Sequence, residues 1–152
     1  MISPTSTDRI SSGVPGLDQR IGGGFLKGTA TILSGAAGSG KTTFGFQFSA
    51  QGVLHGQNSM LCSLEESAGE IRVMAKSLGF DVNELEKKGL HLLSWIPENQ
   101  SPDAFISALA SRIEAVRPSI LILDGLSTFE HLYKQEMYSI TKRLVNLTER
   151  PA

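Results

Sequence analysis

The sequence predicts an α/β fold built on a mostly parallel β-sheet with flanking helices. From residue 29 onward, short β-branched or apolar runs alternate with segments of helical periodicity, which is typical of parallel strands joined by helical crossovers. The run 119–123 (SILIL) is almost wholly apolar, as expected of a strand that is covered on both faces. The length of 152 residues suits one ordinary domain with a single hydrophobic core.

The first strand of this sheet is expected at 29–34 (TATILS), immediately before a glycine-rich loop. A helix is expected over 41–54, where apolar side chains recur at roughly helical spacing. The sequence HGQN at 55–58 predicts a turn, and SMLCS at 59–63 predicts a second strand.

Three helix-start signals mark the rest of the chain. They are Ser67 with Glu70 three residues later, Asp81 with Glu84, and Ser101 with Pro102 at the first helical position. The corresponding helices are expected to end near Gly79, Gly89 and Pro118. Two further strands are expected at 90–95 and 119–123, and a last helix is expected from about Tyr133.

Glycine is concentrated in the first part of the chain, where nine of the sixteen glycines lie between positions 13 and 40. Apolar residues interleave with these glycines, unlike in a flexible Gly/Ser linker, so tight turns or a close approach to a ligand are expected. The sequence is therefore interpreted as one domain over 1–152, with a glycine-rich segment at 1–28 and a core at 29–152.

The sequence GAAGSGKTT at 35–43 fits the phosphate-binding pattern G-x-x-x-x-G-K-[ST] and lies between the predicted strand and helix. In such a loop, successive backbone N–H groups point into one concavity, and the helix N-terminus adds its dipole. Lys41 is expected to place its charge on the β and γ phosphates, in a catalytic as well as a binding role, and the Thr42 hydroxyl is expected to bind Mg²⁺. The candidate residues for binding ATP are Gly35, Ala36, Ala37, Gly38, Ser39, Gly40, Lys41, Thr42 and Thr43.

Acidic residues follow two of the predicted strands at their carboxyl ends. Asp124 is the candidate second metal ligand, and the plainer alternative is a solvated aspartate in a turn. Glu65 and Glu66 could orient or deprotonate an attacking water, and the alternative is that they only precede the next helix. Ser127 and Thr128, just past Asp124, could contact nucleotide or metal-bound water.

Four stretches together resemble the KaiC family of RecA-like P-loop ATPases, in order and in spacing, over nearly the whole chain: RISSGVPGLDQRIGGGF, SGAAGSGKTT, SLEES and ILILDGLS. The resemblance implies that Glu65 and Glu66 are the catalytic pair, with Glu65 the preferred base, and that Asp124 is the Walker B residue. It also implies homo-oligomers in hexameric rings with ATP at the subunit boundaries, and in some members autophosphorylation of Ser or Thr residues.

A RecA-type core continues beyond Walker B into a strand between the P-loop strand and the Walker B strand, and then into strands carrying cations that act on a neighbouring subunit. This chain ends at Ala152, where that strand is expected to begin. The resemblance therefore implies an N-terminal portion of such a domain. We expect this portion alone to bind nucleotide weakly and to show no meaningful ATPase activity.

Composition limits the expected partners. The net charge of -1 gives no overall field for nucleic acid or an anionic membrane, and no apolar run approaches the roughly 18 to 20 residues of a membrane span. The single cysteine, Cys62, excludes an internal disulfide and suits a reducing cytoplasm. Three other functions stay open: a recombinase-like DNA-dependent ATPase, a catalytically silent nucleotide-binding interaction module, and an autokinase.

Overall fold

The computed structural model describes residues 8–95 and 101–148. Its main sheet has three parallel strands in the order β4-β3-β5, namely β3 (Ser59–Ser63), β4 (Leu90–Ser94) and β5 (Ile120–Asp124). At the end of β3, Ser63 lies opposite both Ser94 and Asp124. The carboxyl ends of the three strands therefore meet at one edge of the sheet, where ligands bind in open α/β folds.

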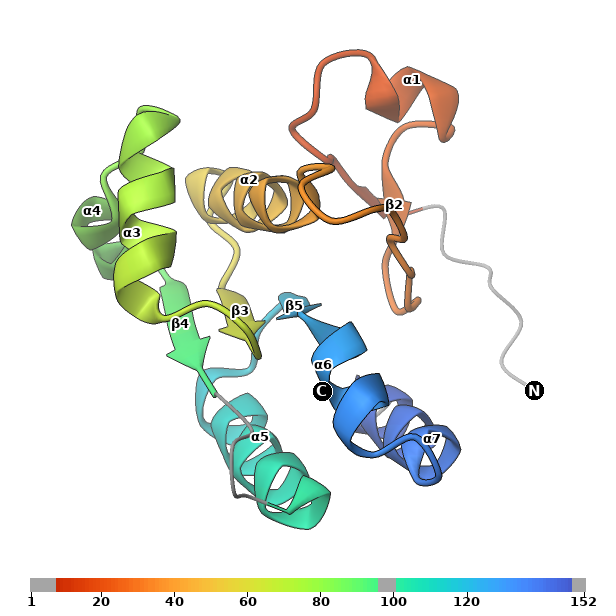
Figure 1. Cartoon of the computed structure of the whole chain (residues 1–152). Coiled ribbons are helices and arrows are strands. Elements are labelled where there is room, and N and C mark those ends of the chain that lie inside the picture. The colour runs from red at the N-terminus through yellow and green to blue at the C-terminus, as the bar shows by residue number, and fades with distance from the viewer. Residues whose placement is uncertain (1–7, 96–100, 149–152) are drawn as a thin grey trace.

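Helices cover both faces of this sheet (Figure 1). They are α2 (Lys41–Leu54), α3 (Ala68–Ser77) and α4 (Val82–Lys87) on one face, and α5 (Pro102–Val116), α6 (Leu126–Leu132) and α7 (Met137–Thr148) on the other. Along β3, Leu61 is buried with residues of the first group, whereas Met60 and Cys62 are buried with residues of the second. The predicted parallel sheet with flanking helices is confirmed.

Two glycines let α2 lie very close to β5. A Cβ atom added at Gly52 would be 2.3 Å from Ile120 Cδ1, and one added at Gly45 would be 3.0 Å from Ile122 Cγ2. A larger residue at position 52 would therefore require the Ile120 side chain or the helix to shift. The last turn of α2 thus packs on the start of β5, and Gly45 packs on the middle of the strand.

The predicted helix starts are confirmed by their capping contacts. The Ser67 hydroxyl accepts the Glu70 N–H at 3.3 Å while the Glu70 carboxylate accepts the Ser67 N–H at 2.8 Å, a complete capping box for α3. The side chains of Asp81 and Ser101 likewise accept backbone N–H groups at the starts of α4 and α5.

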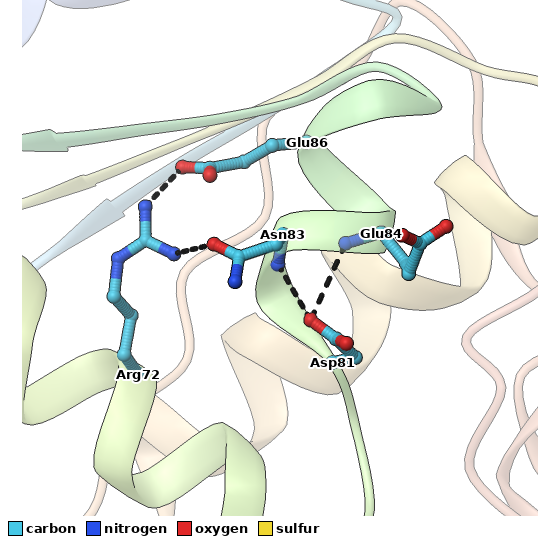
Figure 2. A network of polar contacts seen from close by, with 5 residues as sticks. All are labelled: Arg72, Asp81, Asn83, Glu84 and Glu86. Atoms are coloured by element: carbon cyan, nitrogen blue, oxygen red, sulfur yellow. Dashed lines mark hydrogen bonds and ion pairs between the residues drawn. The ribbon is translucent and has the colours of Figure 1, made fainter.

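A polar network joins α3 to α4 (Figure 2). The Arg72 guanidinium donates to Glu86 Oε1 at 2.6 Å and to Asn83 Oδ1 at 3.1 Å, so one α3 side chain holds two positions of α4. In the same figure, the Asp81 carboxylate accepts the Asn83 and Glu84 N–H groups and so caps the start of α4. The network fixes the relative position of these helices, although exposed ion pairs add little stability.

The glycine-rich N-terminal segment folds against α2 (Figure 1). It contains a two-stranded antiparallel pair and one helical turn, namely β1 (Arg9–Ile10), α1 (Leu17–Arg20) and β2 (Phe25–Leu26). The Phe25 ring packs on Phe44 and Phe48 of α2, with ring centroids 6.2 and 5.0 Å apart. The Gln47 side chain of α2 also donates to the Gly13 carbonyl at 2.8 Å.

Three expectations differ from the structure. Residues 29–34 form no strand, because a strand needs a hydrogen-bonded neighbour and the described residues place none beside this segment. A short helix, α6, follows β5 directly, and the last helix begins at Met137 rather than about Tyr133.

Within 8–95 and 101–148, no helix combines the length and the apolar character needed to cross a membrane.

Candidate functional site

The glycine-rich loop at 35–40 begins the candidate site. Gly38 and Gly40 adopt left-handed backbone angles, with φ of 73° and 89°, which residues with side chains rarely adopt. Gly40 is the N-cap of α2 and supplies no side-chain cap, so the first N–H groups of this helix are not satisfied by a capping side chain. All six loop residues are exposed, which leaves their backbone accessible to a ligand.

Lys41 folds back onto its own loop. Its Nζ donates to the carbonyl oxygens of Gly35 and Ala36, both at 2.9 Å. The ammonium group is therefore held beside the loop rather than extended into solvent. The Thr43 hydroxyl, also predicted to bind nucleotide, donates to Met74 Sδ on α3 at 3.6 Å.

The Thr42 hydroxyl and the Asp124 carboxylate meet at this edge of the sheet. Thr42 Oγ1 donates to Asp124 Oδ2 at 2.7 Å, although 82 positions separate the two residues in the chain. Both side chains are partly buried. A hydroxyl at the start of α2 and a carboxylate at the end of β5 thus converge, as the two motifs predict.

These two oxygens suit a magnesium ion. Mg²⁺ takes oxygen ligands and usually keeps several of its waters, so one carboxylate and one hydroxyl are an adequate protein contribution. In the part of the chain that the structure describes, His, Cys, Asp and Glu side chains do not gather in threes as a metal site. The donor set therefore fits Mg²⁺ bound together with phosphate oxygens better than a metal held by the protein alone.

Glu65 lies beside the turn that follows β5. Its Oε1 accepts hydrogen bonds from Thr128 Oγ1 at 2.5 Å and from Ser127 Oγ at 3.3 Å. Gly125 makes room for this carboxylate, because an added Cβ would lie 2.8 Å from Glu65 Cγ. The structure therefore brings Glu65 next to the Asp124 segment, and the sequence motifs alone did not predict these hydroxyl contacts.

Glu66 is held differently from its neighbour. The buried Ser63 hydroxyl accepts the Glu66 N–H at 2.8 Å, and the Glu66 carbonyl accepts the Ser94 hydroxyl at 3.0 Å. Burial raises the pKa of the Glu66 carboxyl, and the neighbouring carboxylates of Asp124, Glu70 and Glu65 raise it further. Ser63 was not singled out by sequence, since a serine inside an apolar run has no motif to mark it.

A glycine-rich loop, a lysine folded against it, and a hydroxyl and carboxylate pair at the carboxyl edge of a parallel sheet define a P-loop α/β domain. Comparison with known proteins narrows this class. The chain belongs to the KaiC family of ATPases, because the family model described as "ATPase: KaiC" matches residues 10–150.

Curated relatives agree with this family. The chain is 38% identical over 124 residues to the circadian clock oscillator protein KaiC of Picosynechococcus sp. (strain ATCC 27264 / PCC 7002 / PR-6), covering 81% of this chain and 24% of that protein. It is 32% identical over 135 residues to the protein of the same name from Parathermosynechococcus lividus, covering 88% of this chain and 25% of that protein. The chain thus spans about a quarter of the length of these relatives.

Proposed function

We propose that this chain binds ATP with Mg²⁺ through residues 35–43 and that the protein containing it hydrolyses ATP. The observation that carries the proposal is the 2.7 Å contact between Thr42 Oγ1 and Asp124 Oδ2, because it joins the phosphate-loop motif to the acid after the apolar strand. Membership of the KaiC family of ATPases supports the same conclusion.

In this proposal the loop backbone and Lys41 bind phosphate oxygens. Lys41 exchanges its present contacts with the Gly35 and Ala36 carbonyls for the β and γ phosphates. The N–H groups at the start of α2, which no side chain caps, bind a negative charge favourably. Thr42 and Asp124 would hold Mg²⁺, which supplies neutralisation of the phosphate charge.

For hydrolysis, Glu65 is the proposed base. It takes a proton from a water whose oxygen attacks the γ-phosphorus, the bond from that phosphorus to the bridging oxygen breaks, and ADP leaves. Glu65 suits this role because it is exposed and fixed at the same edge as Asp124. Glu66 is less suited, because it is half-buried whereas Glu65 is exposed.

The magnesium dependence of nucleotide binding tests the binding half of the proposal. Fluorescent ATP is titrated into the unsubstituted protein and into Asp124→Asn, each with Mg²⁺ and with EDTA. We expect Mg²⁺ to strengthen binding to the unsubstituted protein and to have little effect on Asp124→Asn. The control is Asp103→Asn, since Asp103 is an exposed aspartate of α5 that pairs with Arg143. Equal strengthening in both aspartate variants would contradict the assignment of Asp124.

Phosphate release tests the hydrolytic half. In the full-length protein, Glu65→Gln is expected to keep nucleotide binding and to lose turnover by about 10²- to 10⁴-fold, as when a general base is removed. Loss with Glu66→Gln alone would assign the role to the other glutamate. The 152-residue chain by itself is expected to release phosphate near background, because the family resemblance implies that a neighbouring subunit supplies a cation.

The proposal also covers assembly and location in the full-length protein. Family membership supports a homo-oligomeric ring of six subunits in the cytoplasm, with bound ATP between subunits. Light scattering with and without ATP measures the assembly. Retention of label from γ-labelled ATP on the protein would add autophosphorylation to its activities.

A further inference from the structure

We infer that Thr128 is a positioning residue that holds the Glu65 carboxylate for proton transfer. The inference rests on the proposed function, since it concerns how the base of that site is oriented. Thr128 lies on α6, 63 positions from Glu65 in the chain, and its hydroxyl donates to Glu65 Oε1 at 2.5 Å. This contact is at the short end of hydroxyl–carboxylate distances.

The contact leaves one carboxylate oxygen for water. Thr128 and Ser127 both donate to Oε1, and within the described residues no side-chain hydrogen bond to Glu65 Oε2 is present. A carboxylate held through one oxygen has a fixed direction for the other. Oε2 of Glu65 is therefore the oxygen that accepts the proton of the attacking water.

The turn after β5 is shaped for this contact. Gly125 has φ of 84°, and an added Cβ there would lie 2.8 Å from Glu65 Cγ and 3.1 Å from Glu65 Cδ. The same turn begins with Asp124, which contacts Thr42. Thr128 and Asp124 belong to one short segment, so the Thr128 hydroxyl also fixes where the Glu65 carboxylate lies relative to the metal-binding carboxylate.

The Thr128 hydroxyl is not explained by helix capping. Gly125 caps α6 without a side-chain hydrogen bond, and the first turn is closed by the backbone bond from Thr128 N to the Gly125 carbonyl at 3.0 Å. On the other side, the Glu65 backbone is fixed by Ser63, whose hydroxyl accepts the Glu65 N–H at 3.4 Å. The backbone of Glu65 is therefore held from β3 and its carboxylate from α6.

The test compares Thr128→Val with Thr128→Ser in the full-length protein. Valine keeps the branched shape and removes the hydroxyl, whereas serine keeps the hydroxyl. We expect Thr128→Val to lower kcat for ATP by about 10- to 100-fold with an unchanged KM and an unchanged Kd for fluorescent ATP. Thr128→Ser is expected to restore most of kcat. Thr141→Val, at an exposed threonine of α7, is the control and is expected to leave kcat unchanged.

A double-mutant cycle shows whether Thr128 acts through Glu65. In the Glu65→Gln background, Thr128→Val is expected to cause no further loss of kcat. Equal kcat for Thr128→Val and the unsubstituted protein, or a full additional loss in the Glu65→Gln background, would overturn the inference alone. No ATP turnover by the unsubstituted protein, or full turnover by Glu65→Gln, would overturn the proposed hydrolysis and this inference with it.

Discussion

Lys41 shows at the scale of one residue how the loop can change partners on binding. Its ammonium group is bound to two carbonyl oxygens of its own loop, which are neutral acceptors. On nucleotide binding, charged phosphate oxygens would take the place of these carbonyl oxygens. We predict that Lys41→Ala weakens binding of fluorescent ATP by about 10- to 100-fold, as expected from loss of a charge-assisted hydrogen bond. Lys76→Ala, at an exposed lysine of α3, is the control. Unchanged affinity for Lys41→Ala would contradict the assignment.

Glu66 gives a prediction about pH. Burial and the nearby acids raise the pKa of its carboxyl above the ordinary 4.5, so the folded state favours the protonated form. The stability that Glu66 contributes is therefore greatest below pH 4.5 and is lost as the pH rises through the raised value. We predict that Glu66→Gln raises Tm by about 1–3 °C at pH 7 and that the gain shrinks as the pH falls toward 4.5.

Thermal melts of Glu66→Gln and the unsubstituted protein across this pH range make the measurement. The control is Glu130→Gln, since Glu130 is exposed on α6. A gain that stays constant with pH would show that side-chain packing, rather than charge, sets the effect of Glu66→Gln.

The residues of the site differ in how far sequence could predict them. The sequence motifs predicted that Thr42 and Asp124 converge, because a glycine-rich loop and an acid after a buried strand have fixed places in a parallel sheet. The contact of Glu65 with Thr128 could not be predicted, since it depends on how α6 turns away from β5. No spacing in the sequence encodes that direction.

At the scale of elements, Gly13 and Gly16 allow the cost of backbone strain to be compared with the cost of a steric clash against α2. Both have positive φ, of 69° and 78°, but an added Cβ at Gly13 would lie 1.9 Å from Gln51 Cγ of α2, whereas one at Gly16 meets nothing within 4 Å. We predict that Gly16→Ala costs about 1 kcal/mol in the free energy of unfolding. Gly13→Ala is expected to cost about 1–3 kcal/mol more, because the N-terminal segment must move away from α2.

Urea unfolding of the two glycine variants measures these costs. Equal destabilisation by Gly13→Ala and Gly16→Ala would mean that Gln51 moves aside freely and that the segment is not closely docked on α2. A larger cost for Gly13→Ala would support its close packing against this helix.

Elements with local signals could be predicted, and those that depend on a partner could not. The starts of α3 and α5 follow from side chains within three residues, such as Ser67 with Glu70, so the sequence predicted them. Residues 29–34 have a strand composition, but a strand forms only beside another strand. The β1–β2 pair was missed because strands of two residues have no periodicity.

At the scale of the whole molecule, the described three-stranded sheet has two edge strands, β4 and β5. β5 pairs with β3 alone, so its other edge presents backbone groups that no described strand satisfies. In the 29–34 segment, Ile32 is 86% exposed and Leu33 is 50% exposed. Open backbone edges and exposed apolar side chains both favour association with other chains.

We therefore predict that the 152-residue chain self-associates with rising concentration and that Ile32→Lys reduces this association. An exposed lysine adds charge to the segment without removing a buried contact, so Tm is expected to stay unchanged. Val73→Lys is the matched control, because Val73 is 73% exposed on α3, away from β5. Sedimentation velocity over a range of concentrations makes the measurement. Equal reduction by both substitutions would point to a general effect of charge, and no reduction by Ile32→Lys would show that 29–34 takes no part in the association.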